Sequence, residues 1–399
     1  MLMALRSLPR TVWVLGAISL LNDSASELVY PLLPLYLSSV LMAGPRALGL
    51  IEGVAESTSS LLKLLSGVLM DRTHRAKPWL VLGYGLAGAG RPLIAAVSSW
   101  PWLLLIRFGD RLGKGLRTSP RDALLAASVA SDQRGLAFGL HRAMDNAGAV
   151  VGPLLAAGLL GAGVPLRQIL LWSALPAALC LVLTLRLQET PVASGTPSAA
   201  LNWRVSLLPT PLKRYLVVLG IFTLGNSSNL FLLFRAQQLG VPAARIPLLW
   251  AAVSAVAMLG STPLSALSDR LGRRRVLLGG YLAYALFYLL MGINTRGGVP
   301  LVLLFAFYGL FMAATEGVEK ALVADLAPPE HNGMAFGWFH LTTGALLLPA
   351  SLLCGWLYQA ASPRAAFAFS ALCAGIALVL LLFWVGPVPA VSSGRASGD

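Results

Sequence analysis

The chain has 399 residues and a formal net charge of +14, with 57% hydrophobic and only 12% charged residues. Because a soluble protein needs about a quarter charged residues, this composition excludes a soluble domain and places the chain in a lipid bilayer. The excess of cations falls mainly on alternate loops, which is typical of membrane insertion rather than of nucleic-acid binding. We therefore expect a multi-pass protein of the cell membrane, in a bacterium the inner membrane, with no nucleic acid among its partners.

Apolar runs of about 20 residues recur along the chain, each long enough to cross roughly 30 Å of hydrocarbon. They lie at residues 11–38, 47–69, 78–97, 101–127, 135–160, 167–186, 212–233, 246–267, 275–293, 299–325, 334–358 and 364–385. The first run has no small-residue cleavage site, so we interpret it as an uncleaved helix. With the basic loops on the inside, the pattern predicts an all-α protein of twelve transmembrane helices with both termini in the cytosol.

The second half of the chain repeats the first at an offset of 198 residues. Asp71-Arg72 recurs as Asp269-Arg270, and the stretch 135–139 recurs in similar form at 333–337. This duplication predicts two pseudo-symmetric six-helix bundles, residues 1–186 and 212–385. A polar, Pro-containing stretch at 187–211 forms the expected cytosolic linker, and the Pro-, Ser- and Gly-rich residues 386–399 form a disordered cytosolic tail.

The first two predicted spans carry carboxylates at bilayer depth. Asp23 and Glu27 lie one helical turn apart in the first span, and the second carries Glu52, Glu56 and Lys63. Because such acids are expensive in hydrocarbon, they favour a proton site in a poorly hydrated cavity. A purely structural pairing with arginine is the alternative for Asp23 and Glu27, and Glu52 is expected near the outer interface.

The fourth span has charged residues at steps of three and four, which builds one polar stripe along a helix. The stripe consists of Arg107, Asp110, Arg111, Lys114, Arg117, Arg121 and Asp122. Because it cannot face lipid, we expect it to line a central cavity, with Arg107, Arg111 and Lys114 binding the cargo and Asp110 among the proton-coupling groups. Arg117 and Arg121 could instead reach along the helix to the cytosol.

The fifth span adds Arg142 and Asp145, which are further candidates for cargo binding. It also contains Gly139, Gly148, Gly152 and Pro153. Glycines four residues apart let helices approach closely, and proline removes a backbone donor, so this pattern predicts a close-packed, kinked hinge. Ordinary small-residue packing is the alternative.

The C-terminal half offers fewer embedded charges, so we expect it to supply shape and apolar contact. Its candidate cargo-binding residues are Asn226, Asn229, Glu316 and Trp338. The repeat offset places Glu319 opposite Arg121, and Lys320 opposite Asp122, with reversed charge at each position. We therefore predict two cross-domain salt bridges that close the cytosolic side and part when that side opens. Separate partners within each half are the alternative.

The loops after the second and eighth spans resemble the short cytosolic motif of the major facilitator superfamily, and with the duplication the resemblance covers the whole chain. It implies a major facilitator fold and a conformational latch formed by Asp71, Arg72, Arg75, Asp269, Arg270 and Arg273. The first copy has His74 where the motif has glycine. The glycine spacing of the fifth span resembles the antiporter motif of this superfamily, although Ala156-Ala157 replaces its last glycines, and Arg107 resembles an arginine associated with proton transfer.

These features favour a proton-coupled exporter of a small organic drug or metabolite by alternating access, as a monomer. The excess of cavity Arg and Lys favours an anionic cargo. A proton-coupled importer of an organic anion is the nearest alternative, and a lipid flippase is a more distant one. We expect no enzyme activity, cofactor or metal, since no nucleophile has a positioned His and Cys180, Cys354 and Cys373 lack metal-type spacing.

Overall fold

The computed structural model describes residues 8–73, 75–129, 134–188, 205–327 and 332–385, and within these ranges it contains helices and no strand. The N-terminal half comprises α2 (Arg10–Val29), the 3-10 turn η1 (Tyr30–Leu32), α3 (Leu33–Ser39), α4 (Pro45–Thr73), α5 (Lys77–Leu93), η2 (Ile94–Ala96), α6 (Trp100–Ala127), α7 (Arg134–Gly161), α8 (Leu166–Trp172) and α9 (Ala174–Arg186). The C-terminal half comprises η4 (Val205–Leu207), α10 (Thr210–Gly225), α11 (Leu230–Gln238), η5 (Ala243–Arg245), α12 (Ile246–Leu271), α13 (Arg273–Ile293), α14 (Val299–Leu326), α15 (Asn332–Ala360) and α16 (Pro363–Phe383). Each predicted apolar run therefore overlaps with helix, although the run 212–233 is interrupted at residues 226–229, between α10 and α11.

Local sequence explains where many of these helices begin. Proline occupies the first turn of α6, α10, α12, α14 and α16, where its missing N–H is not needed and its fixed φ suits the helix. At α16 the Ser362 side chain also accepts a hydrogen bond from the Ala365 N–H. A proline directly after a polar loop therefore marks the start of each of these helices.

Nine helical segments among the described residues are long and apolar enough to cross a membrane. The helices α4, α5 and α6 are not among them, although their lengths and positions match predicted spans. Two of these helices, α4 and α6, carry the buried charges described below, which lower their mean hydropathy. A multi-pass helical membrane protein is confirmed, while the count of twelve spans stays a prediction at these three helices.

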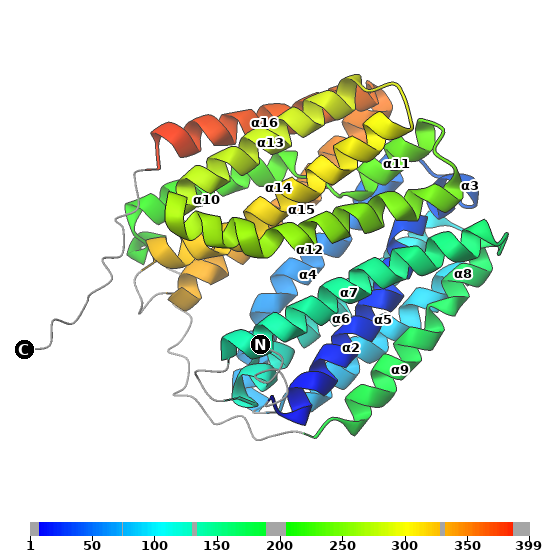
Figure 1. Cartoon of the computed structure of the whole chain (residues 1–399), viewed down its shortest axis with the longest axis horizontal. Coiled ribbons are helices and arrows are strands. Elements are labelled where there is room, and N and C mark those ends of the chain that lie inside the picture. Colours follow the sequence, from blue (N-terminus) through cyan, green and yellow to red (C-terminus); the bar gives the residue numbers. More distant parts are fainter. Residues whose placement is uncertain (1–7, 74, 130–133, 189–204, 328–331, 386–399) are drawn as a thin grey trace, which may run out of the picture.

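The helices form two groups, α2 to α9 and α10 to α16, which lie side by side in Figure 1. Packing pairs recur between the groups: α2 packs on α7 as α10 packs on α15, and α4 packs on α6 as α12 packs on α14. This repetition is the structural counterpart of the duplicated sequence. The groups meet along two seams, α4 against α15 and α7 against α12. The domain boundaries at residues 186 and 212 stay a prediction.

Glycines close the seam between α4 and α15. A Cβ on Gly49 would lie 2.3 Å from the Ser351 carbonyl oxygen, and one on Gly355 would lie 2.6 Å from the Pro45 carbonyl oxygen. Near the same end of the bundle, Gln237 Nε2 donates a 2.8 Å hydrogen bond to Ser38 Oγ. The two groups therefore touch at the end where α3 and α11 lie, which we call the closed end.

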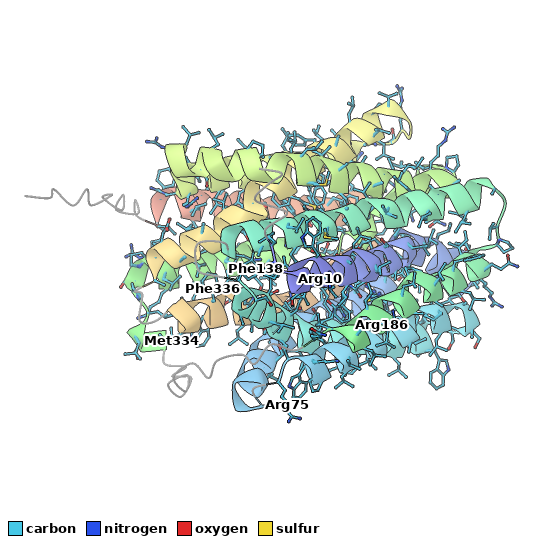
Figure 2. The ribbon with its side chains drawn as sticks, turned by 60° about the horizontal axis from the view of Figure 1, so that its bottom comes forward. Arg10, Arg75, Phe138, Arg186, Met334 and Phe336 are labelled. Atoms are coloured by element: carbon cyan, nitrogen blue, oxygen red, sulfur yellow. The ribbon has the colours of Figure 1, made fainter. Side chains whose placement is uncertain are left out.

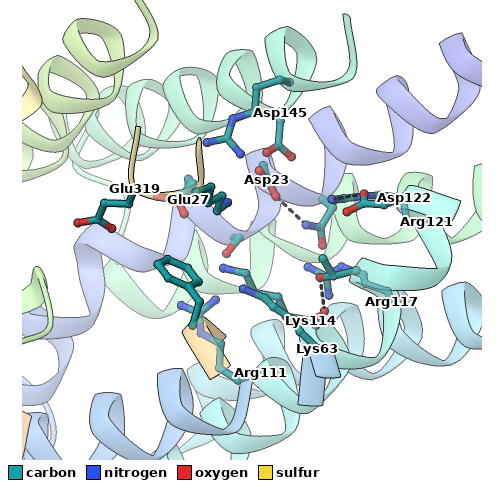
Figure 3. Close-up of a pocket in the computed structure, with 16 residues that line it drawn as sticks. Asp23, Glu27, Lys63, Arg111, Lys114, Arg117, Arg121, Asp122, Asp145 and Glu319 are labelled. Atoms are coloured by element: carbon teal, nitrogen blue, oxygen red, sulfur yellow. Dashed lines mark hydrogen bonds and ion pairs between the residues drawn. The ribbon is translucent and has the colours of Figure 1, made fainter. Parts of the chain in front are cut away.

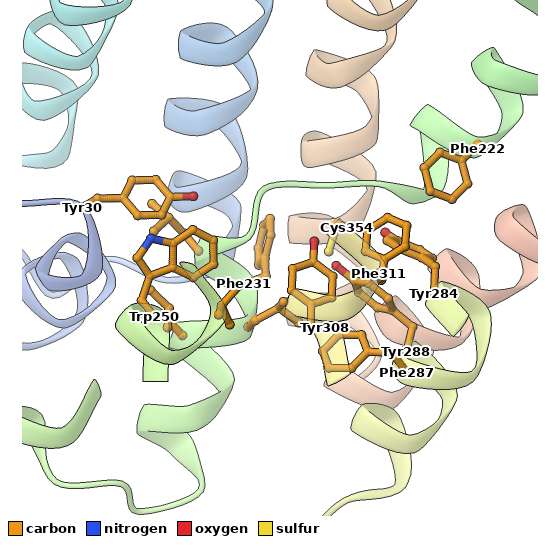
Figure 4. Close-up of a cluster of buried hydrophobic side chains, with 14 of the residues drawn as sticks. Tyr30, Phe222, Phe231, Trp250, Tyr284, Phe287, Tyr288, Tyr308, Phe311 and Cys354 are labelled. Atoms are coloured by element: carbon orange, nitrogen blue, oxygen red, sulfur yellow. The ribbon is translucent and has the colours of Figure 1, made fainter. Parts of the chain in front are cut away.

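Aromatic side chains fill the core of the C-terminal group. The Phe222 and Tyr281 rings stack with centroids 4.1 Å apart, and Tyr284 packs edge-on against Phe311 at 4.8 Å. Figure 4 shows this cluster between α10, α13 and α14. Because its rings are buried, this group is held mainly by apolar contact, unlike the charged interior of the N-terminal group.

Candidate functional site

A charged cavity of about 480 Å³ lies between the two groups of helices. Most of its charged wall comes from α2, α4, α6 and α7, and the C-terminal group adds three side chains (Figure 3). The lining residues are Asn22, Asp23, Ser26, Glu27, Lys63, Arg111, Lys114, Arg117, Thr118, Arg121, Asp122, Arg142, Asp145, Glu319, Lys320 and Phe339. The volume suits a small organic ligand.

The cavity reaches solvent at the end where α2 begins and where α6 and α14 finish, opposite the closed end. Arg142 and Lys320 are exposed there, and the Asp122 side chain is 43% exposed. In the predicted membrane orientation this end faces the cytosol.

The α6 stripe divides into two levels. Arg111, Lys114 and Arg121 lie on the cavity wall, together with Arg117. The residues Arg107 and Asp110, which were expected to share the cavity, are instead only 4% and 2% exposed and do not line it. The reason is that α4 and α5 pack against α6 and cover the turns that carry Arg107 and Asp110.

Asp110 is the centre of a cluster of arginines that lies next to the cavity. Its carboxylate lies 3.1 Å from Arg91, 3.4 Å from Arg107 and 3.8 Å from Arg111. Arg91 Nη1 also donates to the main-chain oxygen of Asn22 at 3.0 Å. One carboxylate therefore ties α5 and α6 together, and Arg91 extends the cluster to α2.

Glu52 is fully buried and forms an ion pair with Arg107 at 2.7 Å. α4 begins at Pro45, so Glu52 is two turns inside the helix and is turned toward α6. Its expected position near the outer interface stays a prediction. Ser228 Oγ donates to the other Glu52 oxygen at 3.3 Å, which joins this pair to the C-terminal group. Sequence reasoning did not select Glu52 or Ser228 as site residues.

Glu56 was likewise not selected, and it contacts the cavity stripe. It lies one turn after Glu52 and pairs with Arg111 at 2.9 Å. The spacing of three to four residues between acids in α4 matches the spacing of arginines in α6, and this matching was the available signal for both pairs.

Asp23 and Asp145 face each other across α2 and α7. Their carboxyl groups lie close enough to repel each other electrostatically, and Ser19 Oγ donates to Asp145 at 2.5 Å. Asn22 Nδ2 donates to Asp23 at 2.7 Å. A proton bound to one of two neighbouring carboxyl groups relieves their mutual repulsion. Both groups line the cavity.

Glycines bring these two acids together. A Cβ on Gly148 would lie 2.5 Å from the Leu20 carbonyl oxygen, and one on Gly152 would lie 2.6 Å from the Leu28 nitrogen. The close approach expected at these glycines is present, and Pro153 follows inside α7. The surroundings of Gly139 lie outside the described part of the structure. Hinge motion at this motif stays a prediction.

Glu27 connects the cavity to the C-terminal group. Trp250 Nε1, from α12, donates a 2.9 Å hydrogen bond to the Glu27 carboxylate, and the Trp250 ring packs at 5.3 Å from that of Tyr30. Sequence reasoning missed Trp250, because nothing in an apolar span marks which aromatic residue meets a carboxylate of another helix.

The predicted gate residues all lie at the open end of the cavity. Arg121 pairs with its neighbour Asp122 at 2.9 Å, and Tyr281 donates to Glu319 at 3.3 Å. The predicted bridges from Arg121 to Glu319 and from Asp122 to Lys320 are not formed between these described side chains. The cavity is open here, which is the arrangement in which the bridges were expected to be parted.

The predicted cargo-binding residues of the C-terminal half lie away from the cavity. Asn229 accepts a 2.6 Å hydrogen bond from Tyr308, and Asn226 accepts one of 3.3 Å from Tyr284, so both asparagines serve the aromatic cluster. Trp338 packs against the same large core. None of these three lines the cavity, which corrects the expectation, and the Glu316 side chain lies outside the described residues.

Only part of the predicted latch is described. Arg273 Nε lies 3.4 Å from Asp325, and its Nη1 donates to Ser268 at 2.7 Å, which joins α13 to the ends of α14 and α12. Gly272 has φ +92°, a left-handed conformation that suits glycine in the preceding turn. Arg75 is exposed. The side chains of Asp71, Arg72, Asp269 and Arg270, and residue His74, lie outside the described residues.

Within the described ranges, no group of three His, Cys, Asp or Glu side chains is arranged to hold a metal ion. The cysteines Cys180, Cys354 and Cys373 are free and buried.

Comparison with known proteins shows a family match over nearly the whole chain. The model of the Major Facilitator Superfamily matches residues 13–258 and 215–398. An uncharacterized MFS-type transporter of Methanocaldococcus jannaschii is 34% identical, over 95% of this chain and 96% of its own length. The multidrug resistance protein MdtH of Photorhabdus laumondii is 27% identical, over 83% of this chain and 82% of its own. The crystal structure of the nucleoside transporter NupG has the same fold, with a TM-score of 0.74 at 15% identity over 94% of this chain and 98% of its own.

Proposed function

Because the chain belongs to the Major Facilitator Superfamily and is a membrane transporter rather than an enzyme, we propose that it is a proton-coupled exporter of a small organic anion. The observation that carries the proposal is the pair of neighbouring carboxyl groups, Asp23 on α2 and Asp145 on α7, on the cavity wall. A proton bound to this pair is placed to exchange as the cavity opens and closes. The cargo binds in the same cavity, where it displaces solvent.

The direction of transport rests on two resemblances. The protein MdtH, to which this chain is similar over most of its length, is named for multidrug resistance, which implies export. The spacing of Gly148, Gly152 and Pro153 in α7 resembles the antiporter motif, and these glycines pack directly on the helix that carries Asp23. Movement of α7 along α2 would therefore change the surroundings of the proton.

Import of an organic anion in symport with protons is the second candidate, and one observation favours it. A proton on the Asp23–Asp145 pair removes negative charge from a cavity that binds an anion, so charge alone makes proton and cargo bind together. Antiport requires that the proton weaken cargo binding. For an anion, that opposition has to come from the conformational change.

The experiment that tests the proposal uses purified protein in sealed proteoliposomes with a pH-sensitive dye inside. Small organic anions, cations and neutral compounds are added outside in turn, at equal pH on both sides. An antiporter moves protons out of the lumen as solute enters, and a symporter moves them in, so the sign of the pH change separates the two candidates.

The control is the Asp23→Asn variant, which can hold no exchangeable proton at that position. We expect it to bind cargo but to move no protons. If no anion in the panel triggers proton movement while a cation or neutral compound does, the anionic cargo is wrong. If the Asp23→Asn and Asp145→Asn variants both couple normally, the carboxyl pair is not the proton site.

A further inference from the structure

The cations of the cavity wall differ in what they contact. Arg121 pairs with Asp122 at 2.9 Å, and Arg111 pairs with Glu56 at 2.9 Å. Arg142 and Lys320 lie at the mouth of the cavity. Deeper in the wall are Lys63, Lys114 and Arg117, and no carboxylate of the described residues lies within 4.0 Å of their nitrogens. We call these three the cation triad.

Helix packing forces the two lysines of the triad together. A Cβ on Gly115 would lie 2.4 Å from Leu62 Cβ, so α6 touches α4 at the residues next to Lys114 and Lys63. Figure 3 shows both side chains reaching into the same part of the pocket, and they repel each other electrostatically. Two like charges held in contact favour an anion between them.

Arg117 completes the triad from one turn further along α6. It is 5% exposed, and its guanidinium lies over the Tyr84 ring with 4.7 Å from Cζ to the ring centroid. Its Nη1 is buried and has no hydrogen-bond partner within the described structure. A buried charged donor without an acceptor is unfavourable, so this nitrogen is placed to donate to an oxygen of a bound ligand.

The acids that face the triad are already engaged. Asp23 accepts a hydrogen bond from Asn22, and Asp110 is held by Arg91, Arg107 and Arg111. Glu27 accepts from Trp250. These acids attract the triad from a distance and form no ion pair with it, so its positive charge favours binding of an anion.

We propose that Lys63, Lys114 and Arg117 form a subsite for a phosphate or phosphonate group of the cargo. This inference rests on the proposed transport function and names its substrate class. A phosphate monoester carries about 1.5 to 2 negative charges at pH 7 and offers three acceptor oxygens, one for each cation. A carboxylate has one charge and two oxygens, so it leaves a member of the triad unsatisfied. The remaining volume of the cavity takes the organic part of the molecule.

The test measures binding to the purified full-length protein by isothermal titration calorimetry. The probes share one aromatic body: phenyl phosphate, phenylphosphonate, benzoate and the cation phenyltrimethylammonium, with inorganic phosphate as the bare group. We expect phenyl phosphate and phenylphosphonate to bind at least tenfold more tightly than benzoate, and phenyltrimethylammonium not to bind. Equal or weaker binding of phenyl phosphate relative to benzoate overturns the subsite.

Variants test each member of the triad. We expect Lys63→Gln and Lys114→Gln each to weaken phenyl phosphate binding about tenfold and to reduce its advantage over benzoate. Arg117→Lys keeps the charge and loses the planar fork, so it should weaken phosphate and phosphonate more than benzoate. Lys213→Gln, at the start of α10 away from the cavity, should leave all affinities unchanged. If Lys114→Gln matches Lys213→Gln, the triad does not bind the anion.

Two readouts separate this inference from the proposed function. Size-exclusion chromatography of each variant shows whether it is folded, so loss of binding by a folded variant counts for the subsite. Phosphate binding without proton movement in proteoliposomes contradicts the transport proposal and leaves the subsite standing. Proton movement driven by other anions, with no phosphate binding, does the reverse.

Discussion

The indole of Trp250 donates a 2.9 Å hydrogen bond to the Glu27 carboxylate, and this bond joins the C-terminal group of helices directly to the cavity. The same indole packs on Tyr30, which lies toward the closed end. The charge state of Glu27 therefore bears on how firmly the two groups meet, because a protonated carboxyl is a weaker acceptor than a carboxylate. Glu27 therefore both lines the cavity and takes part in the contact between the two groups of helices.

The Trp250→Phe variant should loosen the closed end. Phenylalanine keeps apolar packing on Tyr30 but leaves the Glu27 carboxylate without its donor. In a Ser38→Cys background, we expect thiol labelling at residue 38 to become severalfold faster, since Ser38 contacts Gln237 between the two groups at the closed end. Trp172→Phe, an exposed tryptophan of α8, is the matched control and should change nothing. Equal labelling rates in Trp250→Phe and its parent would contradict the link.

The Glu52→Gln variant should lower the stability of the protein by about 3 kcal/mol, because Arg107 is then left as a buried charge that has lost its closest partner. Glu56→Gln provides the matched control one turn along the same helix. Its ion pair with Arg111 is partly hydrated, with the Glu56 side chain 31% exposed, so we expect a loss of about 1 kcal/mol or less. Thermal unfolding in detergent ranks the two variants, and a smaller loss for Glu52→Gln would show that Arg107 is satisfied by other groups.

The positions of the helices could be predicted from the sequence, whereas the partners of the buried charges could not. An apolar run of about 20 residues has one low-energy structure in lipid, a helix, so the runs and the helices overlap. Glu52 and Arg107 lie 55 residues apart, and which turn of α4 meets which turn of α6 depends on tight glycine contacts such as Gly115 on Leu62. No periodicity in a single helix encodes that register.

The errors at Asn226 and Asn229 have a related cause. A polar residue in an apolar span needs a partner, and cargo is one possibility, but a tyrosine hydroxyl of the same core is another. The structure supplies Tyr284 and Tyr308. The duplication showed which helices of the two halves correspond. It could not show which polar side chains face the cavity and which face the aromatic core.

The Gly152→Leu variant should impair folding or motion of the N-terminal group. Any side chain at this position meets the backbone of α2 at Leu28 and Ser24, with contacts below 3 Å, so α7 must move away from the helix that carries Asp23. Gly158, two turns later in α7, has nothing within 4 Å, and Gly158→Leu is therefore the control. We expect Gly152→Leu to lose about 2 kcal/mol or more of stability and to lose proton coupling, as measured by thermal unfolding and by proton movement. A fully coupled and stable Gly152→Leu protein would show that close packing here is dispensable.

The mouth of the cavity offers a test of alternating access itself. In the open arrangement Arg121 pairs with Asp122, and Glu319 accepts from Tyr281. If closure brings Arg121 to Glu319, Arg121→Glu places two acids face to face and should abolish transport, whereas Arg121→Glu combined with Glu319→Arg restores opposite charges and should recover part of it. Recovery by the double variant, measured against each single variant in proteoliposomes, isolates the pair from the local contact with Asp122, because that contact is lost equally in the single and double variants. A double variant as inactive as Arg121→Glu alone means that the mouth closes through other residues.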